Sequence, residues 1–395
     1  MGYKKHIINF ILLALMIMCI GFSSGFLNKS KDNKEVDNIY LKENSMNMSQ
    51  INEMQINEEK EEKKVPFTAW KQIEDESIYF EYLGKKAEAD VIEICGNSDL
   101  IVKGPILFLD NEEGCLLDKK TAYTLFGSTN AKGQVVKYGE RELAVIGIHE
   151  GLDKTVIVQA LKDSKNNDDV TGIAIGVNEN EDGSVKVFKN RYSVMAKSVS
   201  NRIYYNIAFW ISLILPLIII SSVVFKLIKR IRKLKRKPVL FLIYIGITVV
   251  VIAIFIKILD LELKIPYDLI PNRWSDFGYW SELFKKYSTD LREVMYMKKY
   301  NFDIPSIEAS IKSIFFSIVA LLLFMRCKNT IKVDNLNKSV LSILFMLVTS
   351  FTTILILHYK FSLEVSGLII WGLYPFYFLA TYLSTDEFNL NLEEK

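Results

Sequence analysis

The stretch TLFGSTNAKGQVVKYGERELAVIGI, residues 124–148, indicates a soluble α+β domain inside a chain that is otherwise rich in apolar residues. Asp118 can cap a short helix, and Gly127 can end it because glycine readily takes a left-handed backbone conformation. Residues 134–138 then read as a strand, the dipeptide GE turns the chain, and residues 141–148 return as an antiparallel partner. The stretch therefore predicts a helix packed on a β-hairpin.

Long apolar segments dominate the rest of the chain. Of its 395 residues, 50% are hydrophobic and 12% are aromatic, more than soluble globular proteins usually show. A helix needs about 20 apolar residues to cross a bilayer, and about six segments approach this length; the fourth does so only if residues 307–313 extend its apolar run. We expect membrane helices at residues 1–27, 204–227, 239–257, 307–325, 339–358 and 366–384. The predicted fold class is a polytopic α-helical membrane protein with an α+β extracytoplasmic domain inserted after the first helix.

The first apolar segment has two interpretations, and the basic residues set the orientation. Lys4 and Lys5 before a short apolar run also fit a signal peptide, but the cleavage pattern is poor, so we expect a retained helix. The run KLIKRIRKLKRKP, residues 226–238, is basic and lacks acids, which predicts a cytoplasmic loop. The chain is therefore expected in the cell membrane, with its large domain outside and both termini, including the tail of residues 385–395, in the cytoplasm.

The exported part of the chain changes character at about residue 65. Residues 28–64 are rich in Asn, Lys, Glu and Ser and lack a lasting apolar period, so we expect a disordered extracellular tether. Residues 65–200 contain short apolar stretches separated by turn signals, which predict strands.

The order of these elements resembles the MacB-like periplasmic core domain of MacB/FtsX-like ABC transporter permeases. In that family an Ala-x-x-Leu-Phe-Gly helix end precedes a Gly-x-x-Val strand and a Val-x-Gly strand. The matching positions here are Ala122, Leu125, Phe126, Gly127, Gly133, Val135, Val136, Val145 and Gly147. The placement after the first membrane helix also matches, and Leu125, Phe126 and Gly127 serve as landmarks of the fold.

The resemblance implies a permease-like membrane subunit of an ABC transporter or mechanotransmission complex that acts on extracytoplasmic substrates or partners. It also implies a separate cytoplasmic ABC ATPase, and a homodimer or a second permease subunit. The chain lacks a G-x-x-x-x-G-K-[ST] phosphate loop, so ATP binding of that kind belongs to another polypeptide. Such permeases usually have four membrane helices and a longer coupling sequence than residues 226–238. These departures leave open an alternative, a non-transport membrane sensor or assembly factor without ATPase coupling.

Two regions are candidate interfaces. The basic run offers Lys229, Arg230 and Arg232, which suit either anchoring to lipid headgroups or a partner. The outer loop of residues 260–306 predicts an amphipathic helix after Ser275 or Asp276. Trp and Tyr are typical of the membrane–water interface, so we expect this helix to lie on the lipid bilayer, with a docking surface as the alternative. Its candidate interface residues are Trp274, Trp280, Phe284 and Tyr287.

Catalytic chemistry finds little support in the sequence. His6, His149 and His358 fall in separate parts of the chain, and nothing gathers them into a metal site or a triad, so we expect no enzyme, cofactor or metal. The 49 basic and 46 acidic residues balance, which offers no case for nucleic acid as a partner. Cys95 and Cys115 share the exported domain, where they either form a disulfide or remain two buried thiols.

Overall fold

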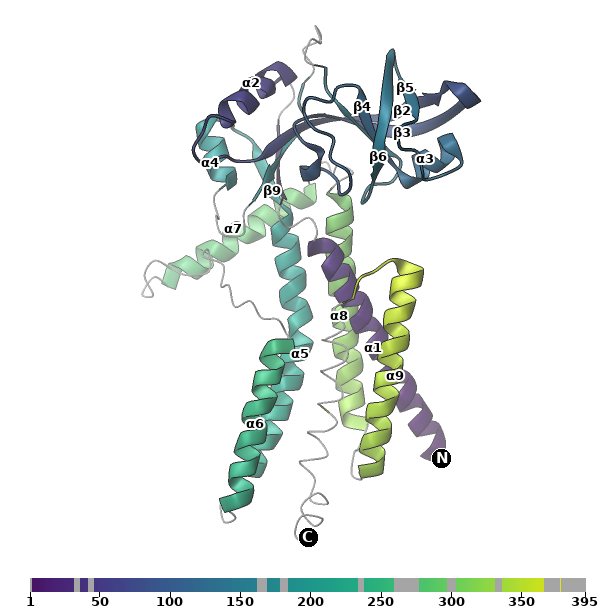
Figure 1. The fold of residues 1–395 in the computed structure, drawn as a ribbon. Helices are drawn as coiled ribbons and strands as arrows, with labels where there is room; N and C mark the ends of the chain where they lie inside the picture. The colour runs from purple at the N-terminus through teal and green to yellow at the C-terminus, as the bar shows by residue number, and fades with distance from the viewer. Residues whose placement is uncertain are drawn as a thin grey trace. The chain divides into compact units, whose positions relative to one another are not determined.

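The computed structural model describes residues 2–31, 36–41, 46–161, 169–177, 184–233, 238–258, 277–296, 303–330, 336–365 and Tyr377. The chain divides into two compact units, and Figure 1 labels most of the elements of each. The sheet unit comprises Asn33–Ile203 and Pro266–Ile307, and the helical unit comprises Met1–Asp32, Tyr204–Ile265 and Glu308–Lys395. Two helices, α5 (Asn201–Lys233) and α8 (Ile304–Thr330), start in the sheet unit and continue in the helical unit.

The sheet unit is built on nine strands within the described ranges. They follow the order β3, β7, β4, β6, β5, β2, β8, β1 and β9, and β2 also pairs with β3. This extra pairing closes the first six strands of the order into a ring, and the last three extend beyond it. The strands are β1 (Val36–Tyr40), β2 (Phe67–Phe80), β3 (Lys85–Cys95), β4 (Gly114–Asp118), β5 (Val135–Tyr138), β6 (Arg141–His149), β7 (Thr155–Gln159), β8 (Gly172–Gly176) and β9 (Lys197–Ser200).

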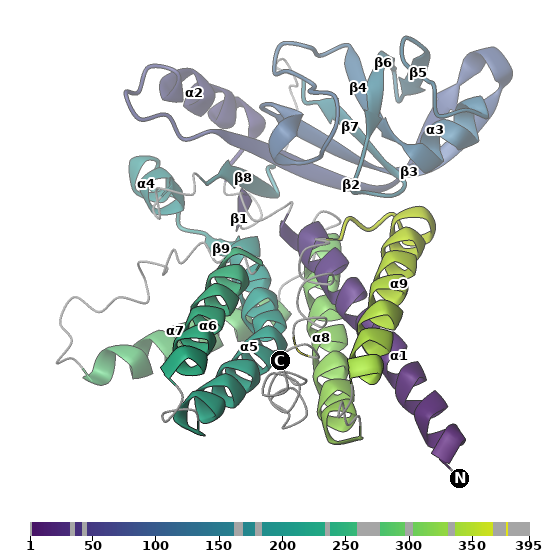
Figure 2. The same ribbon diagram turned by 60° about the horizontal axis from the view of Figure 1, so that its bottom comes forward.

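The long strand β2 links the closed part of the sheet to its extension. Its start pairs with β8, and the strand pairs with β3 from Ala69 to Phe80. One apolar core, which includes Leu117 and Leu125, lies in the closed part with α3 (Lys119–Phe126). Another, which includes Ile173 and Phe188, lies on the extension with α2 (Met48–Glu58) and α4 (Ser184–Arg191). Figure 2 shows α2 and α4 together at one end of the sheet and α3 at the other.

The helix and hairpin predicted around residues 124–148 are confirmed. The Asp118 carboxylate caps α3 by accepting from the backbone N–H groups of Lys120 (2.8 Å) and Thr121 (3.3 Å). Gly127 ends the helix with a φ of 71°, and β5 pairs with β6 in an antiparallel hairpin. A Cβ atom at Gly147 would lie 2.5 Å from Cγ of Pro105, so only glycine fits at this motif position without a shift of its neighbours.

The prediction of a disordered tether over residues 28–64 is wrong for the described parts of that segment. Helix α1 (Gly2–Lys31) continues into it, and both β1 and α2 belong to the folded sheet unit. The Asn47 side chain caps α2, and Ile39 of β1 and Ile51 of α2 are fully buried. The composition hid this fold because few apolar residues carry it and their partners, β8 and α4, lie far along the chain.

The helical unit contains four helices that are long and apolar enough to cross a membrane, counted over the described residues alone. They are α1, α5, α8 and α9 (Leu336–Phe361), and α8 includes the extension that the fourth predicted span required. Helix α6 (Pro238–Ile258) covers the predicted third span. Its apolar part, Pro238–Ala253, is shorter than the apolar parts of these four helices and is not counted with them. The predicted sixth span and the tail lie outside the described residues, except for Tyr377. Four of the six predicted spans are thus long enough in the structure.

Apolar side chains and a row of serines hold the helical unit together. The apolar core draws on α1, α5, α6, α8 and α9, and includes Met16, Ile219, Tyr244, Phe324 and Met346. Between α1 and α8, Ser23 Oγ lies 2.6 Å from Ser317 Oγ, and Ser30 Oγ lies 2.6 Å from Ser310 Oγ. Ser313 Oγ donates to the Ser23 carbonyl at 2.9 Å. Such small polar residues let membrane helices approach closely.

Candidate functional site

The candidate functional site lies where the sheet passes into the long helices. Strand β9 ends at Ser200 and α5 begins at Asn201, so no linker separates them. Helix α8 begins directly after Asp303, whose side chain is hydrogen-bonded to that of Asn38 in β1. Strands β1 and β9 are neighbours, with Asn38 opposite Val199. We call Asn38, Asp303 and the starts of α5 and α8 the strand–helix junction.

Asn38 and Asp303 form a buried polar pair at this junction. The Asn38 amide Nδ2 donates to Oδ1 of Asp303 at 2.8 Å, and the exposed fractions of the two residues are 1% and 3%. The Asp303 carbonyl accepts the first α-helical hydrogen bond of α8, from Ile307 N–H at 3.1 Å, which makes Asp303 the N-cap residue. The side-chain hydrogen bond between Asn38 and Asp303 therefore holds the first turn of α8 to β1.

Burial changes the acidity of this carboxyl. Removal from water raises the pKa of Asp303 to about 7, against the smaller lowering effect of the Asn38 hydrogen bond. A buried carboxyl with this pKa exchanges its proton near neutral pH. The junction can thus hold or release one proton.

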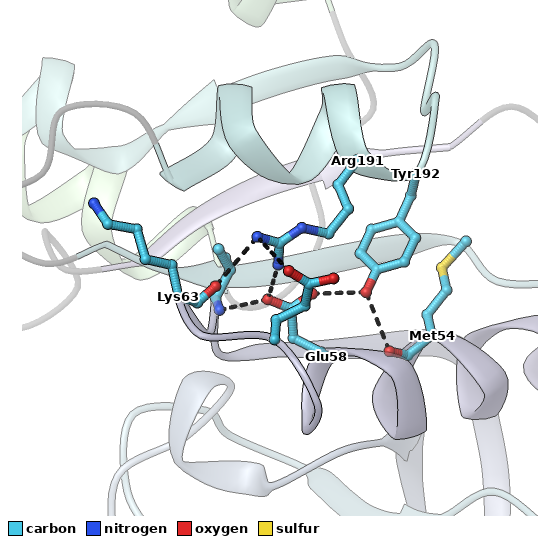
Figure 3. Close-up of polar contacts among 7 residues, drawn as sticks. Met54, Glu58, Lys63, Arg191 and Tyr192 are labelled. Atoms are coloured by element: carbon cyan, nitrogen blue, oxygen red, sulfur yellow. Dashed lines mark hydrogen bonds and ion pairs between the residues drawn. The ribbon is translucent and has the colours of Figure 1, made fainter.

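A second polar cluster, the α2–α4 clasp, fixes the outer end of the sheet extension (Figure 3). The Glu58 carboxylate forms an ion pair with Arg191 and accepts from Tyr192 Oη at 2.6 Å and from Val65 N–H at 2.7 Å. Burial alone would raise the pKa of Glu58, but these three hydrogen bonds and the Arg191 charge outweigh it and lower the pKa. Arg191 also donates to the Lys63 carbonyl at 3.2 Å. The clasp joins the end of α2 and the residues after it to the end of α4 and Tyr192.

The three predicted basic interface residues lie in the last turns of α5, which continues through the basic run to Lys233. Lys229 and Arg232 are exposed. Arg230 is buried, with an exposed fraction of 5%, and is hydrogen-bonded to Tyr244 of α6. The structure therefore brings Lys229 and Arg232 to the surface and places Arg230 between two helices.

The predicted amphipathic helix is confirmed as α7 (Phe277–Tyr296). Trp280 and Phe284 stand four residues apart, on one face, with exposed fractions of 47% and 76%. Trp274 lies outside the described residues, and Tyr287 lies in α7 but its side chain is outside them. The part of this face that the structure describes is aromatic and uncovered by the chain.

The predicted disulfide alternative is wrong, because Cys95 and Cys115 do not bond to each other. Both are buried, and their strands β3 and β4 lie on opposite sides of β7. Adjacent strands are about 4.8 Å apart, so these two strands are about 10 Å apart, beyond the reach of a disulfide. The other interpretation of these cysteines, two buried thiols, is confirmed.

No metal-binding cluster occurs among the described side chains. No group of three or more His, Cys, Asp or Glu residues within those ranges can hold a metal ion. His149 ends β6, as predicted; its Nε2 lies 3.0 Å from the Thr155 carbonyl, and burial lowers its pKa. These features suit a structural histidine.

The sequence reasoning did not identify the junction or the clasp. A signal for the junction exists in the run DIPS, residues 303–306, because Asp is a preferred N-cap and Pro is favoured in the first turn of a helix. No local pattern marks Asn38, Glu58 or Arg191. Asn38 bonds to Asp303, and Glu58 to Arg191, over more than a hundred residues of chain; the contact between Glu58 and Val65 is local.

Comparisons with known proteins find likenesses among solved structures, and two of them are as follows. The periplasmic region of MacB from Actinobacillus actinomycetemcomitans is 12% identical, with 43% of this chain and 90% of that chain covered and a TM-score of 0.34. The extracellular domain of the noncanonic ABC-type transporter YknZ from Gram-positive bacteria is 17% identical, with 41% and 97% covered and a TM-score of 0.30. No family model and no curated protein matches the sequence. At these TM-scores neither likeness assigns a family or a function to the chain.

Proposed function

We propose that this chain is a permease-like membrane subunit that carries motion between the cytoplasm and an extracytoplasmic sheet domain, driven by a separate ATPase. The observation that carries the proposal is that α5 and α8 begin in the sheet unit and continue through the helical unit as apolar spans. In this proposal both termini are cytoplasmic, the sheet unit works on substrates or partners outside, and the chain itself is not an enzyme.

The length of the two helices supports this role. At 1.5 Å per residue, α5 with its 33 residues is about 50 Å long and α8 with its 27 residues is about 40 Å long. A continuous helix transmits displacement along its axis better than a flexible linker does. Because α5 follows β9 with no intervening residue, a displacement of the helix reaches the sheet through covalent structure.

The basic end of α5 is the proposed contact for the ATPase. Lys229 and Arg232 are exposed there, and two exposed cations on a helix suit an acidic surface on a cytoplasmic partner. Arg230 holds α5 to α6, so a force applied at this end is shared by two helices.

A second candidate function is a membrane sensor or assembly factor that lacks ATPase coupling. The short basic run favours it, because it replaces the longer coupling sequence that such permeases usually carry. The two candidates differ in what they bind in the cytoplasm.

Affinity purification from the native membrane in mild detergent, followed by mass spectrometry, separates them. The proposal predicts stoichiometric recovery of an ABC ATPase, and its loss from a variant with Lys229→Gln and Arg232→Gln. The matched control carries Lys285→Gln and Arg292→Gln on α7, which removes the same charge elsewhere and should retain the ATPase. Recovery of outer-surface or membrane proteins alone, with no ATPase, would overturn the permease proposal in favour of the sensor.

A further inference from the structure

One polar atom of the buried pair at the strand–helix junction has no hydrogen-bond partner among the described residues. Asn38 Nδ2 is used by Asp303, but Asn38 Oδ1 is buried and accepts no hydrogen bond from the part of the chain that the structure describes. Buried acceptors in folded proteins are nearly always satisfied. A donor is therefore expected close to Asn38 Oδ1.

A proton on Asp303 supplies that donor. A protonated carboxyl has one O–H donor and keeps acceptor capacity on its other oxygen. Facing a carboxamide, it can accept from Nδ2 and donate to Oδ1, so that both groups are satisfied by two parallel hydrogen bonds. An ionised Asp303 accepts only, so Asn38 Oδ1 stays without a donor and a charge remains buried.

We propose that Asp303 and Asn38 form a proton-controlled latch, which holds the first turn of α8 to β1 when Asp303 is protonated and loosens when it is ionised. The latch is a property of the sheet unit and does not depend on an ATPase. If the sheet unit faces outward, the latch reads the acidity outside the cell.

Charged residues lie on the described elements next to the pair. Strand β1 carries Asp37, β9 carries Lys197, the first turn of α5 carries Arg202, and β8 has no titratable residue. Glu308 and Lys312 of α8 form an ion pair with each other. Burial raises the pKa of the Asp303 carboxyl, and the Asn38 hydrogen bond lowers it by less.

The sign of the pH effect follows from the direction of the pKa shift. The pKa of Asp303 is about 7 in the latched state, and the ordinary value of an opened, solvated Asp is about 3.9. The latch is thus fully stabilised below the opened-state value and weakens as pH rises. One proton gives a change of up to about tenfold per pH unit in the opening equilibrium, and the change ends near pH 7, above which both states are ionised.

Hydrogen exchange of the full chain in nanodiscs tests the latch. Amides in the first turns of α8 should lose protection by up to about tenfold per unit between pH 5 and 7 after correction for intrinsic exchange, and should level off above that. Amides of β6 serve as the internal reference. Equal corrected protection of α8 at every pH in the wild type would overturn the proposal.

Asp303→Asn is the decisive variant, because a second carboxamide can accept from and donate to Asn38 as the protonated acid does. It should fold, keep the protected α8 start from pH 5 to 8.5, and lose the pH dependence. Asn38→Ala should open the α8 start at all pH values. A pH slope in Asp303→Asn equal to that of the wild type would show that another group titrates. Infrared spectra of the same samples should contain a protonated carboxyl band that Asp303→Asn lacks, which reports the proton even if α8 exchanges too slowly to follow.

Discussion

Replacing Glu58 by Gln should release α2 from the sheet unit. The variant keeps the size of the side chain but removes the charge that faces Arg191, and it weakens the acceptor of Tyr192 and Val65. Breaking a fully buried ion pair costs about 3–5 kcal/mol, and exposed pairs are worth about 0–1 kcal/mol. The Glu58 side chain is 6% exposed and that of Arg191 is 21% exposed, so we expect a loss of about 2–4 kcal/mol in the opening free energy of α2.

The assay is hydrogen exchange of the peptide that covers Met48–Glu58 in the full chain. Since every 1.4 kcal/mol is a factor of ten, exchange should become about 30- to 700-fold faster, while the β6 peptide stays unchanged. Glu61→Gln is the matched control, because Glu61 is 47% exposed and lies 3.5 Å from Arg191. It should change the free energy by less than about 1 kcal/mol. Wild-type exchange rates for Glu58→Gln, or equal effects of the two variants, would refute the reasoning.

The clasp also has a pH dependence of known sign. The lowered pKa of Glu58 means that its stabilising contribution is present above the ordinary Glu pKa and is lost as pH falls through the lowered value. Acid should therefore loosen α2 in the wild type, and Glu58→Gln should remove that part of the acid response. The junction behaves in the opposite way, since acid strengthens it.

Three further predictions test the packing of the sheet unit. Leu125→Ala should destabilise it by about 2–5 kcal/mol because Leu125 is fully buried, whereas Tyr123→Ala on the exposed face of α3 should cost under about 0.5 kcal/mol, as read from thermal unfolding. Gly147→Ala should cost about 1–3 kcal/mol through its contact with Pro105, and Gly246→Ala in α6 of the helical unit, where a Cβ meets no atom within 4 Å, should leave the stability of the sheet unit unchanged. Burial raises the pKa of Cys115 to about 12, so maleimide should label it at pH 8 only after unfolding, and rapid labelling of the folded protein would contradict this burial.

The local parts of the fold were predictable because their signals are short-range. Asp118, Gly127 and the turn between β5 and β6 act on residues within a few positions, and the apolar spans are recognisable by length alone. The amphipathic pattern of α7 belongs to the same kind of signal. In each case the sequence window that forms the element also contains the reason for it.

The parts that were missed depend on distant partners. Residues 28–64 have the composition of a tether, yet Ile39 and Ile51 become buried because β8 and α4 supply the other side of their core. The order of strands around β7, which separates Cys95 from Cys115, is likewise a property of the whole sheet. The run DIPS marks Asp303 as a helix N-cap, but nothing in the sequence points to Asn38, 265 positions away, as its partner.

In the proposed mechanism, motion passes between a cytoplasmic ATPase and the sheet unit through α5 and α8. The most direct test is hydrogen exchange of the purified complex, in nanodiscs, with and without ATP. The account predicts that ATP changes exchange in β1, β9 and the first turn of α8, and that a variant with Gly residues inserted between Ser200 and Asn201 loses the change in β9 while the ATPase still turns over. Unchanged exchange throughout the sheet unit, in a complex that hydrolyses ATP, would contradict it.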